Sequence, residues 1–263
     1  MTITEQPFRG WSPEAVVFDC DGTLMDTEEH WQDARRRAFR EFGLRPAPGF
    51  AERAKGVHYL DCGRMMAEEA DKPQLAPELT ESLLAHFMER VADDPVTMPG
   101  AAEFVRSLSG RLPLAVASNC PLTVVERSLE RAGLLSHFGH IVVPGDPGPT
   151  GATTGNPDGG TTGSTGRGTT GTRGRGTTGG GTLIRPKPWP DVYATAALLC
   201  GARNDRTLAV EDSLTGIESA RRAGLRVVGV GDRPADGRAD TADLWVPALN
   251  APELLELDWV RPG

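Results

Sequence analysis

Short apolar runs recur along the chain, and polar residues or glycine bound each of them. Runs of this length that are rich in β-branched residues and show no polar alternation are typical of strands buried on both faces of a sheet. They predict strands at 15–18, 114–118, 140–143, 207–210 and 226–230.

Amphipathic helical patterns follow the second and the fourth of these runs. One carries apolar residues from Val124 to Ala132 and stops at Gly133, and the other begins near Ile217 and stops at Gly224. Glycine is the residue that most often ends a helix. The alternation predicts an α/β fold with a doubly wound, Rossmann-like parallel sheet, whose binding crevice lies at the carboxyl ends of the strands.

One stretch, 28–94, breaks the alternation because it contains no convincing strand. Its apolar residues fall at helical spacing in two groups, Trp31, Ala34, Ala38, Phe39 and Phe42, and later Leu79, Leu83, Leu84, Phe87 and Val91. The pattern predicts an all-α cap domain inserted into a core formed by 1–27 and 95–263. The chain would cross between the two units twice, near 26–27 and 93–99, which is how a hinged cap over a site is built.

Glycine and proline are abundant, but the glycine excess is confined to one window. Residues 145–182 hold 15 of the 32 glycines, together with 12 threonines. Such a segment cannot bury apolar area, so we expect a flexible, disordered insertion in the core, with a functional lid as the alternative. Its deletion is expected to preserve the fold and most of the activity.

Composition narrows the possible partners. The formal net charge of −8 disfavours binding to nucleic acid, whose phosphates an acidic surface repels. No apolar run is long enough to cross a bilayer and no signal peptide is visible, so a cytoplasmic protein without a membrane partner is expected. The four widely spaced cysteines are expected to be reduced and mostly buried. The oligomeric state is not indicated.

The strongest chemical signal is the stretch VVFDCDGT, in which a buried strand runs directly into Asp19 and then Asp21. Two carboxylates at this spacing can divide the roles of nucleophile and general acid/base. Gly22 permits the sharp turn that follows. An isolated DxD would more often be an Asp-rich turn that caps a helix, so the interpretation depends on further features.

Three further polar features lie at, or just beyond, strand ends. Ser118–Asn119 could bind phosphoryl oxygens or could form the N-cap of a helix that begins near Pro121. Lys187 is held between two prolines, which restrict where it points. Glu211–Asp212 offers oxygen ligands for Mg²⁺, ahead of Ser213 as a helix N-cap. Together with the two aspartates, this set suits phosphoryl transfer, in which catalysis is mostly positioning and charge neutralisation.

These motifs resemble those of the haloacid dehalogenase-like hydrolase superfamily, and most closely its phosphatase and β-phosphoglucomutase branch with a helical cap. The resemblance rests on DCDGT at 19–23, Ser118, KPWPD with Lys187, and EDSLTGIESARRAG at 211–224, and it covers nearly the whole chain except 145–182.

The resemblance implies a role for each motif. Asp19 would be the nucleophile that forms an aspartyl-phosphate, and Asp21 the acid/base. Mg²⁺ would be held by Asp19, the main-chain carbonyl of Asp21 and Asp212, with support from Glu211. The phosphate- and substrate-binding set would be Gly22, Thr23, Ser118, Asn119, Lys187 and, from a cap loop that reaches the site, Lys55 and Gly56.

Three functions follow from this interpretation. The first is a Mg²⁺-dependent phosphatase of a small phosphorylated metabolite, a sugar or polyol phosphate. The second is a sugar phosphomutase of the β-phosphoglucomutase type. The mutase is weaker, because members of that type carry a histidine a few residues after the DT pair, where this chain has His30 and Trp31 in an unsettled register. The third is a non-catalytic phosphate-binding or regulatory protein whose lysine the insertion has displaced.

Overall fold

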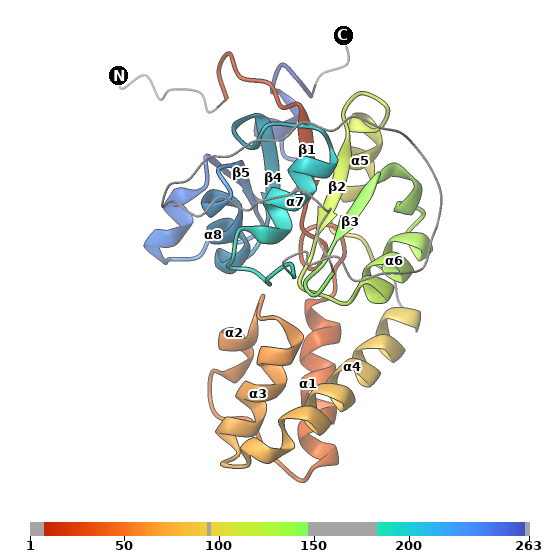
Figure 1. Ribbon diagram of the computed structural model, residues 1–263, viewed down its shortest axis with the longest axis vertical. Coiled ribbons are helices and arrows are strands. Elements are labelled where there is room, and N and C mark those ends of the chain that lie inside the picture. The colour runs from red at the N-terminus through yellow and green to blue at the C-terminus, as the bar shows by residue number, and fades with distance from the viewer. Residues whose placement is uncertain (1–7, 94–95, 147–182, 261–263) are drawn as a thin grey trace, which may run out of the picture.

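A six-stranded parallel sheet forms the centre of the molecule (Figure 1). The computed structural model describes residues 8–93, 96–146 and 183–260. The strand order is β3-β2-β1-β4-β5-β6, with all neighbours parallel. The strands are β1 (Ala15–Phe18), β2 (Leu114–Ala117), β3 (His140–Val142), β4 (Thr207–Glu211), β5 (Arg226–Val230) and β6 (Leu244–Val246).

The predicted doubly wound α/β fold is confirmed, and five of the six strands lie where the apolar runs indicated. The sixth, β6, was not predicted. It has three residues at the edge of the sheet, Leu244, Trp245 and Val246, and Leu244 and Trp245 are only half-buried. All three are apolar, but only Val246 is β-branched, so the segment does not match the pattern of the predicted runs.

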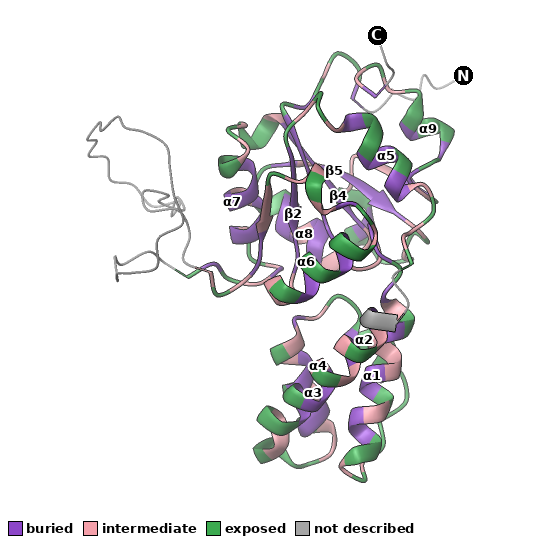
Figure 2. Cartoon of the chain, turned by 90° about the vertical axis from the view of Figure 1, so that its right-hand side faces the viewer, coloured by how far each residue is buried: buried purple, intermediate pink, exposed green. Residues whose placement is uncertain are grey.

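Alternate residues of the strands pack against two different helical layers, and the strands themselves are buried (Figure 2). In β1, Val16 and Phe18 belong to one apolar cluster, whereas Val17 belongs to the other. The first cluster contains side chains of α5 (Ala101–Leu108), α6 (Leu122–Arg131) and α9 (Pro252–Leu255), and the second those of α7 (Asp191–Leu199) and α8 (Leu214–Arg222). Coverage on both faces explains the continuous apolar runs of the strands.

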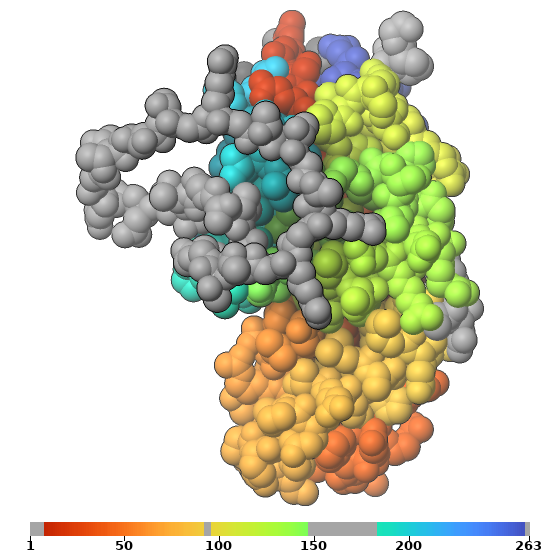
Figure 3. Space-filling model, turned by 45° about the vertical axis from the view of Figure 1, so that its right-hand side comes forward, coloured from red at the N-terminus to blue at the C-terminus, as the bar shows by residue number. Residues whose placement is uncertain are grey.

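Four helices form the inserted cap, which lies below the sheet in Figure 1 and against the core in Figure 3. They are α1 (Glu28–Glu41), α2 (Phe50–Ala54), α3 (Tyr59–Glu69) and α4 (Ala76–Asp93). Trp31 and Phe87 stack between α1 and α4 with ring centroids 3.7 Å apart. Short 3₁₀ helices occur at Pro73–Leu75, Leu135–His137, Asn204–Arg206 and Gly237–Thr241.

The two chain crossings between cap and core lie side by side. The Asp26 N–H donates to the Val96 carbonyl at 2.8 Å, and the Met98 N–H donates to the Leu24 carbonyl at 2.9 Å. The carboxyl ends of the strands point toward the cap (Figure 1), so the predicted crevice faces it. The exact domain boundaries, 1–27, 28–94 and 95–263, stay a prediction.

The predicted insertion, 145–182, lies outside the described residues except for its first two. Where the described chain resumes, the Gly145 N–H donates to the Ile184 carbonyl at 2.9 Å, and the Ile184 N–H donates to the Asp146 carbonyl at 3.2 Å. These two bonds hold the ends of the segment together.

Two compositional expectations can be compared with the structure. Cys20, Cys62 and Cys120 are buried and Cys200 is half-buried, and all four are free thiols. Among the helices of the described residues, none combines the length and the apolar character needed to cross a bilayer.

Candidate active site

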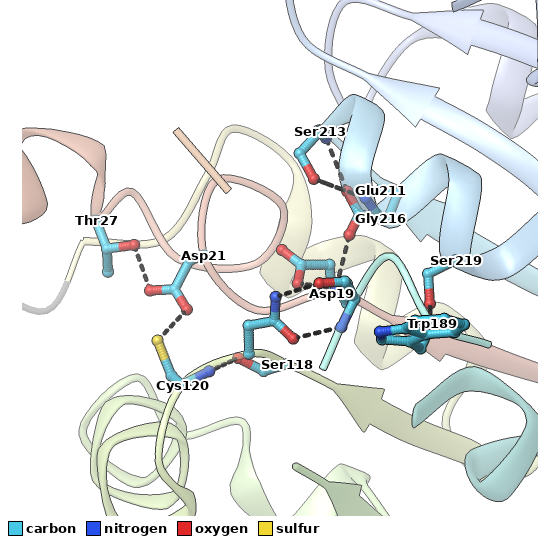
Figure 4. A network of polar contacts seen from close by, with 12 residues as sticks. Asp19, Asp21, Thr27, Ser118, Cys120, Trp189, Glu211, Ser213, Gly216 and Ser219 are labelled. Atoms are coloured by element: carbon cyan, nitrogen blue, oxygen red, sulfur yellow. Dashed lines mark hydrogen bonds and ion pairs between the residues drawn. The ribbon is translucent and has the colours of Figure 1, made fainter. Parts of the chain in front are cut away.

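The predicted acidic residues converge where β1 and β4 lie next to each other. Asp19 directly follows β1 and Glu211 is the last residue of β4 (Figure 4). Asp212 comes next in the chain. Beyond this pair of strands the winding of the sheet reverses, because β2 and β3 lie on one side of β1 while β5 and β6 lie beyond β4. A reversal of this kind opens a crevice at the carboxyl ends of the strands.

Lys187 joins the acids of this crevice into a buried ionic cluster. Its Nζ lies 2.5 Å from Asp19 Oδ1 and 2.6 Å from Glu211 Oε1. The three side chains are 3%, 9% and 0% exposed, in the order Lys187, Asp19 and Glu211. The lysine is therefore in the site, and the premise that the insertion displaces it is wrong.

Asn119 positions the main chain of Lys187. Its Oδ1 accepts from the Lys187 N–H at 2.8 Å, and its Nδ2 donates to the Lys187 carbonyl at 3.4 Å. Ser118 does not cap the following helix, since Pro121 holds the N-cap position of α6 and no side chain caps it. The Ser118 hydroxyl instead accepts from the Cys120 N–H at 3.0 Å, and it lines the cavity beside Asp19.

Glu211 is held by the start of α8. Its Oε2 accepts from the Ser213 N–H at 2.7 Å and from the Ser213 hydroxyl at 2.9 Å. Ser213 also accepts from the Gly216 N–H at 3.1 Å, which confirms it as the N-cap of α8. A Cβ at Gly216 would come within 1.6 Å of Glu211 Oε1, so only glycine leaves room for this carboxylate.

The carboxylate of Asp21 is separate from this cluster and accepts from three side chains, two at the start of α1 and one after β2. Thr27 Oγ1 donates to its Oδ1 at 2.6 Å and the Cys120 thiol donates to Oδ2 at 2.9 Å (Figure 4). Trp31 Nε1 also donates to Oδ1, at 3.3 Å. Thr27 and Trp31 lie at the base of the cap, so the orientation of Asp21 depends on where the cap sits.

Burial and the closeness of like charges perturb the protonation of Asp19 and Asp212. Burial, with the nearby charges of Glu211 and Asp212, raises the pKa of Asp19 well above its usual range despite Lys187. Burial and the charge of Glu211 raise the pKa of Asp212 to about 7. Burial alone would lower the pKa of Lys187, but Asp19 and Glu211 outweigh it and raise the pKa.

The same acids suit a hard divalent cation. Asp19, Glu211 and Asp212 each offer an oxygen, and these oxygens lie within 4.8 Å of one another. Carboxylate oxygens are the ligands that Mg²⁺ prefers, and a divalent charge would counteract the burial and like-charge repulsion that raise the pKa values of Asp19 and Asp212. Gly22 has φ +86°, and a Cβ there would lie 2.5 Å from Asp212 Oδ2, so the glycine allows this approach.

A small cavity of about 60 Å³ lies between core and cap and opens onto this cluster. The core wall contains the predicted residues Asp19, Asp21, Ser118, Asn119, Lys187 and Asp212, and the cap wall contains the predicted Lys55 and Gly56. Lys55 Nζ lies 3.4 Å from Asp212 Oδ2. Gly22 and Thr23, also predicted to bind phosphate or substrate, do not line the cavity. The Gly22 N–H donates to the Met25 carbonyl in the turn, and Thr23 is fully buried.

The prediction missed most residues of the cap wall, among them Glu28, Trp31, Arg35 and Tyr59. The first three are spaced i, i+3 and i+7 along α1 and so share one helix face. This spacing was visible in the sequence, but nothing there showed that the face turns toward the site.

Comparison with known families agrees with the fold and with the grouping of residues. The model of haloacid dehalogenase-like hydrolases matches residues 16–147 and 177–230, which is most of the chain. The chain belongs to the haloacid dehalogenase-like hydrolases. The hydrolase predicted from the motifs is thereby confirmed at the level of the family.

Two curated relatives in this hydrolase family match over most of their length. The phosphorylated carbohydrates phosphatase of Thermotoga maritima is 27% identical over 86% of this chain and 89% of its own. The phosphoglycolate phosphatase of Pseudomonas putida is 26% identical over 88% of this chain and 74% of its own. A crystal structure of β-phosphoglucomutase from Clostridium difficile has a TM-score of 0.68 at 18% identity, covering 94% of this chain and 95% of its own, which shows a common fold.

Proposed function

We propose that this hydrolase is a Mg²⁺-dependent phosphatase that acts on a small phosphorylated metabolite of the sugar- or polyol-phosphate class. One observation carries the proposal: a buried carboxylate, Asp19, faces a cavity at the carboxyl ends of the strands with an ammonium group, Lys187, 2.5 Å away. The relatives named above are phosphatases of phosphorylated carbohydrates and of phosphoglycolate, which supports the substrate class.

Asp19 is the proposed nucleophile. One of its carboxylate oxygens attacks the phosphorus atom, so an O–P bond forms to Asp19 while the bond from phosphorus to the ester oxygen breaks. The ammonium of Lys187 and the hydroxyl of Ser118 lie on the same cavity and bind the phosphoryl oxygens, whose charge must be offset during transfer.

Asp21 is the proposed acid/base. It gives a proton to the departing ester oxygen, and in the second step it takes a proton from the water that attacks the aspartyl-phosphate. This step releases inorganic phosphate and regenerates the Asp19 carboxylate. The hydrogen bonds from Thr27, Trp31 and Cys120 hold the carboxyl group of Asp21 in place between core and cap.

Asp19, Asp212 and the main-chain carbonyl of Asp21 would hold Mg²⁺, with Glu211 in support. When bound, the ion supplies positive charge that screens the phosphoryl oxygens from the carboxylates around them. Lys187 remains paired with Glu211, which keeps its ammonium group beside Asp19.

The test is release of inorganic phosphate by the purified full chain from a panel of phosphomonoesters, with Mg²⁺ and with EDTA. We expect turnover that requires Mg²⁺ and that Asp19→Asn abolishes. The exposed Asp258→Asn is the matched control and is expected to behave as wild type. An active Asp19→Asn variant would refute the proposed mechanism.

The same assay separates the alternatives. With β-glucose 1-phosphate, a phosphatase releases free phosphate, whereas a mutase yields an isomeric sugar phosphate. A protein that binds Mg²⁺ but turns over no member of the panel would instead be a non-catalytic phosphate binder.

A further inference from the structure

A buried arginine lies in the cap wall of the cavity, where the proposed chemistry does not require one. The side chain of Arg35, on α1, is only 6% exposed. Its neighbours in the run, Arg36 and Arg37, are 60% and 38% exposed. Burying a guanidinium group is costly unless its charge and its donors find partners.

The partners that Arg35 has are few for its five N–H donors. Its Nε donates to the Trp31 carbonyl at 3.1 Å, and its Nη2 donates to Glu28 Oε1 at 3.3 Å. Within the described part of the chain, no acceptor receives a hydrogen bond from its Nη1. Glu28 is shared, because its Oε1 also accepts from Gln32 Nε2 at 3.1 Å. The guanidinium therefore reaches the cavity with donors left over.

The charges of the cap wall also favour an anionic ligand. Of the cap residues that line the cavity, Arg35 and Lys55 are cations and Glu28 is the one carboxylate. The wall as a whole is cationic, and it faces the place where the phosphoryl group would lie. A ligand that spans from core to cap therefore meets positive charge at both ends, from Lys187 and from Arg35.

We propose that Arg35 binds a second anionic group of the substrate, a carboxylate or a second phosphate, while the transferred phosphoryl group lies against Asp19 and Lys187. The assignment rests on the proposed phosphatase function and narrows its substrate class. A planar guanidinium matches both anions through paired hydrogen bonds, which a lysine does not reproduce. The favoured substrates are thus small phosphomonoesters with a second negative charge.

The experiment compares matched substrates in the full chain with Mg²⁺. One pair is 2-phosphoglycolate and its neutral analogue 2-hydroxyethyl phosphate, which tests a carboxylate. The other is fructose 1,6-bisphosphate and fructose 1-phosphate, which tests a second phosphate. The readout within each pair is the kcat/KM of the substrate with a second anionic group divided by the kcat/KM of the substrate without one. For wild type we expect a ratio of about ten or more in at least one pair, the usual scale for a charge-assisted hydrogen bond.

Arg35→Gln is expected to lower that ratio about tenfold or more, chiefly through KM, and Arg35→Lys to recover part of it. Arg36→Gln, at the exposed neighbouring position, is the matched control and leaves the ratio unchanged. If Arg35→Gln does not fold, Glu28→Gln tests the role of Arg35 by removing the carboxylate that pairs with it. Removal of this carboxylate frees Arg35, so the ratio should rise.

The outcomes separate this inference from the proposed function. A wild-type enzyme that releases phosphate but shows no preference for the second anion overturns the role of Arg35 alone. The role of Arg35 is also overturned if Arg35→Gln lowers kcat/KM equally for both substrates of a pair, which would indicate a purely structural arginine. An unchanged kcat/KM ratio in Glu28→Gln overturns it as well. A wild-type protein that releases no phosphate from any substrate overturns both proposals.

Discussion

Replacing Lys187 by methionine keeps the length and apolar stem of the side chain and removes only its charge and its hydrogen bonds. In the native protein its Nζ lies 2.5 Å from Asp19 and 2.6 Å from Glu211, and all three side chains are at least nine-tenths buried. The variant leaves two carboxylates in a water-poor site without their shared cation. Removing one partner of a buried ion pair costs about 3–5 kcal/mol, a large part of the 5–15 kcal/mol that stabilises a typical domain.

We therefore expect Lys187→Met to lower the free energy of unfolding by about 3–5 kcal/mol in EDTA. The assay is urea unfolding followed by circular dichroism, with linear extrapolation to water. Saturating Mg²⁺ should recover part of the loss, since the ion supplies the positive charge that the variant lacks. The exposed Lys72→Met is the control for loss of a lysine charge and should change the stability by less than about 0.5 kcal/mol.

A second variant isolates the cause. Lys187→Met combined with Glu211→Gln removes one charge of each sign, so it should be more stable than Lys187→Met alone by about 1 kcal/mol or more. If Lys187→Met in EDTA stays within about 1 kcal/mol of wild type, the buried carboxylates do not depend on this ammonium group, and the electrostatic account of the site is refuted.

Three further predictions concern the parts that position the cluster. Gly216→Ala should destabilise the protein by about 1–3 kcal/mol, because its Cβ would overlap Glu211, although alanine is the better helix former. Gly237→Ala is the control, since a Cβ there would have nothing within 4 Å, and equal stability of the two variants would contradict the packing argument. Asn119→Ala should lower kcat/KM about tenfold by releasing the main chain of Lys187, with partial rescue in Asn119→Asp, and unaltered kinetics would remove its positioning role. Replacing 147–182 by a short Gly/Ser linker should leave kcat within about threefold, because Gly145 and Ile184 already hold the ends together; a large fall in kcat at unchanged thermal stability would contradict this.

Much of the fold was predictable because burial on both faces of a parallel sheet leaves a direct trace in the sequence. The runs at 15–18, 207–210 and 226–230 are continuous and apolar, and each is a central strand. The edge strand β6 is apolar too, but it has three residues of which only Val246 is β-branched, so it does not resemble the predicted runs. The helical cap was predictable for a different reason: α1 and α4 each bury one face, which leaves apolar residues at helical spacing.

The candidate site was predictable in its core half and not in its cap half. Asp19 and Glu211 each lie at a strand end, and a parallel sheet brings such positions to one edge whatever the connections between them. In the run Arg35–Arg36–Arg37, by contrast, three identical residues differ in their surroundings. Only Arg35 is buried and lines the cavity, and nothing in the sequence distinguishes it from the other two.

The sequence by itself determined the kind of protein, because the strand periodicity and the acids, hydroxyl and lysine placed after the strands are local properties of the chain. Only the tertiary structure decided which groups meet. Asn119 holds Lys187 across 68 positions, and Cys120 reaches Asp21 across 99. Contacts of this range depend on how helices and loops pack, and packing is a property of the whole molecule that no single stretch of sequence encodes.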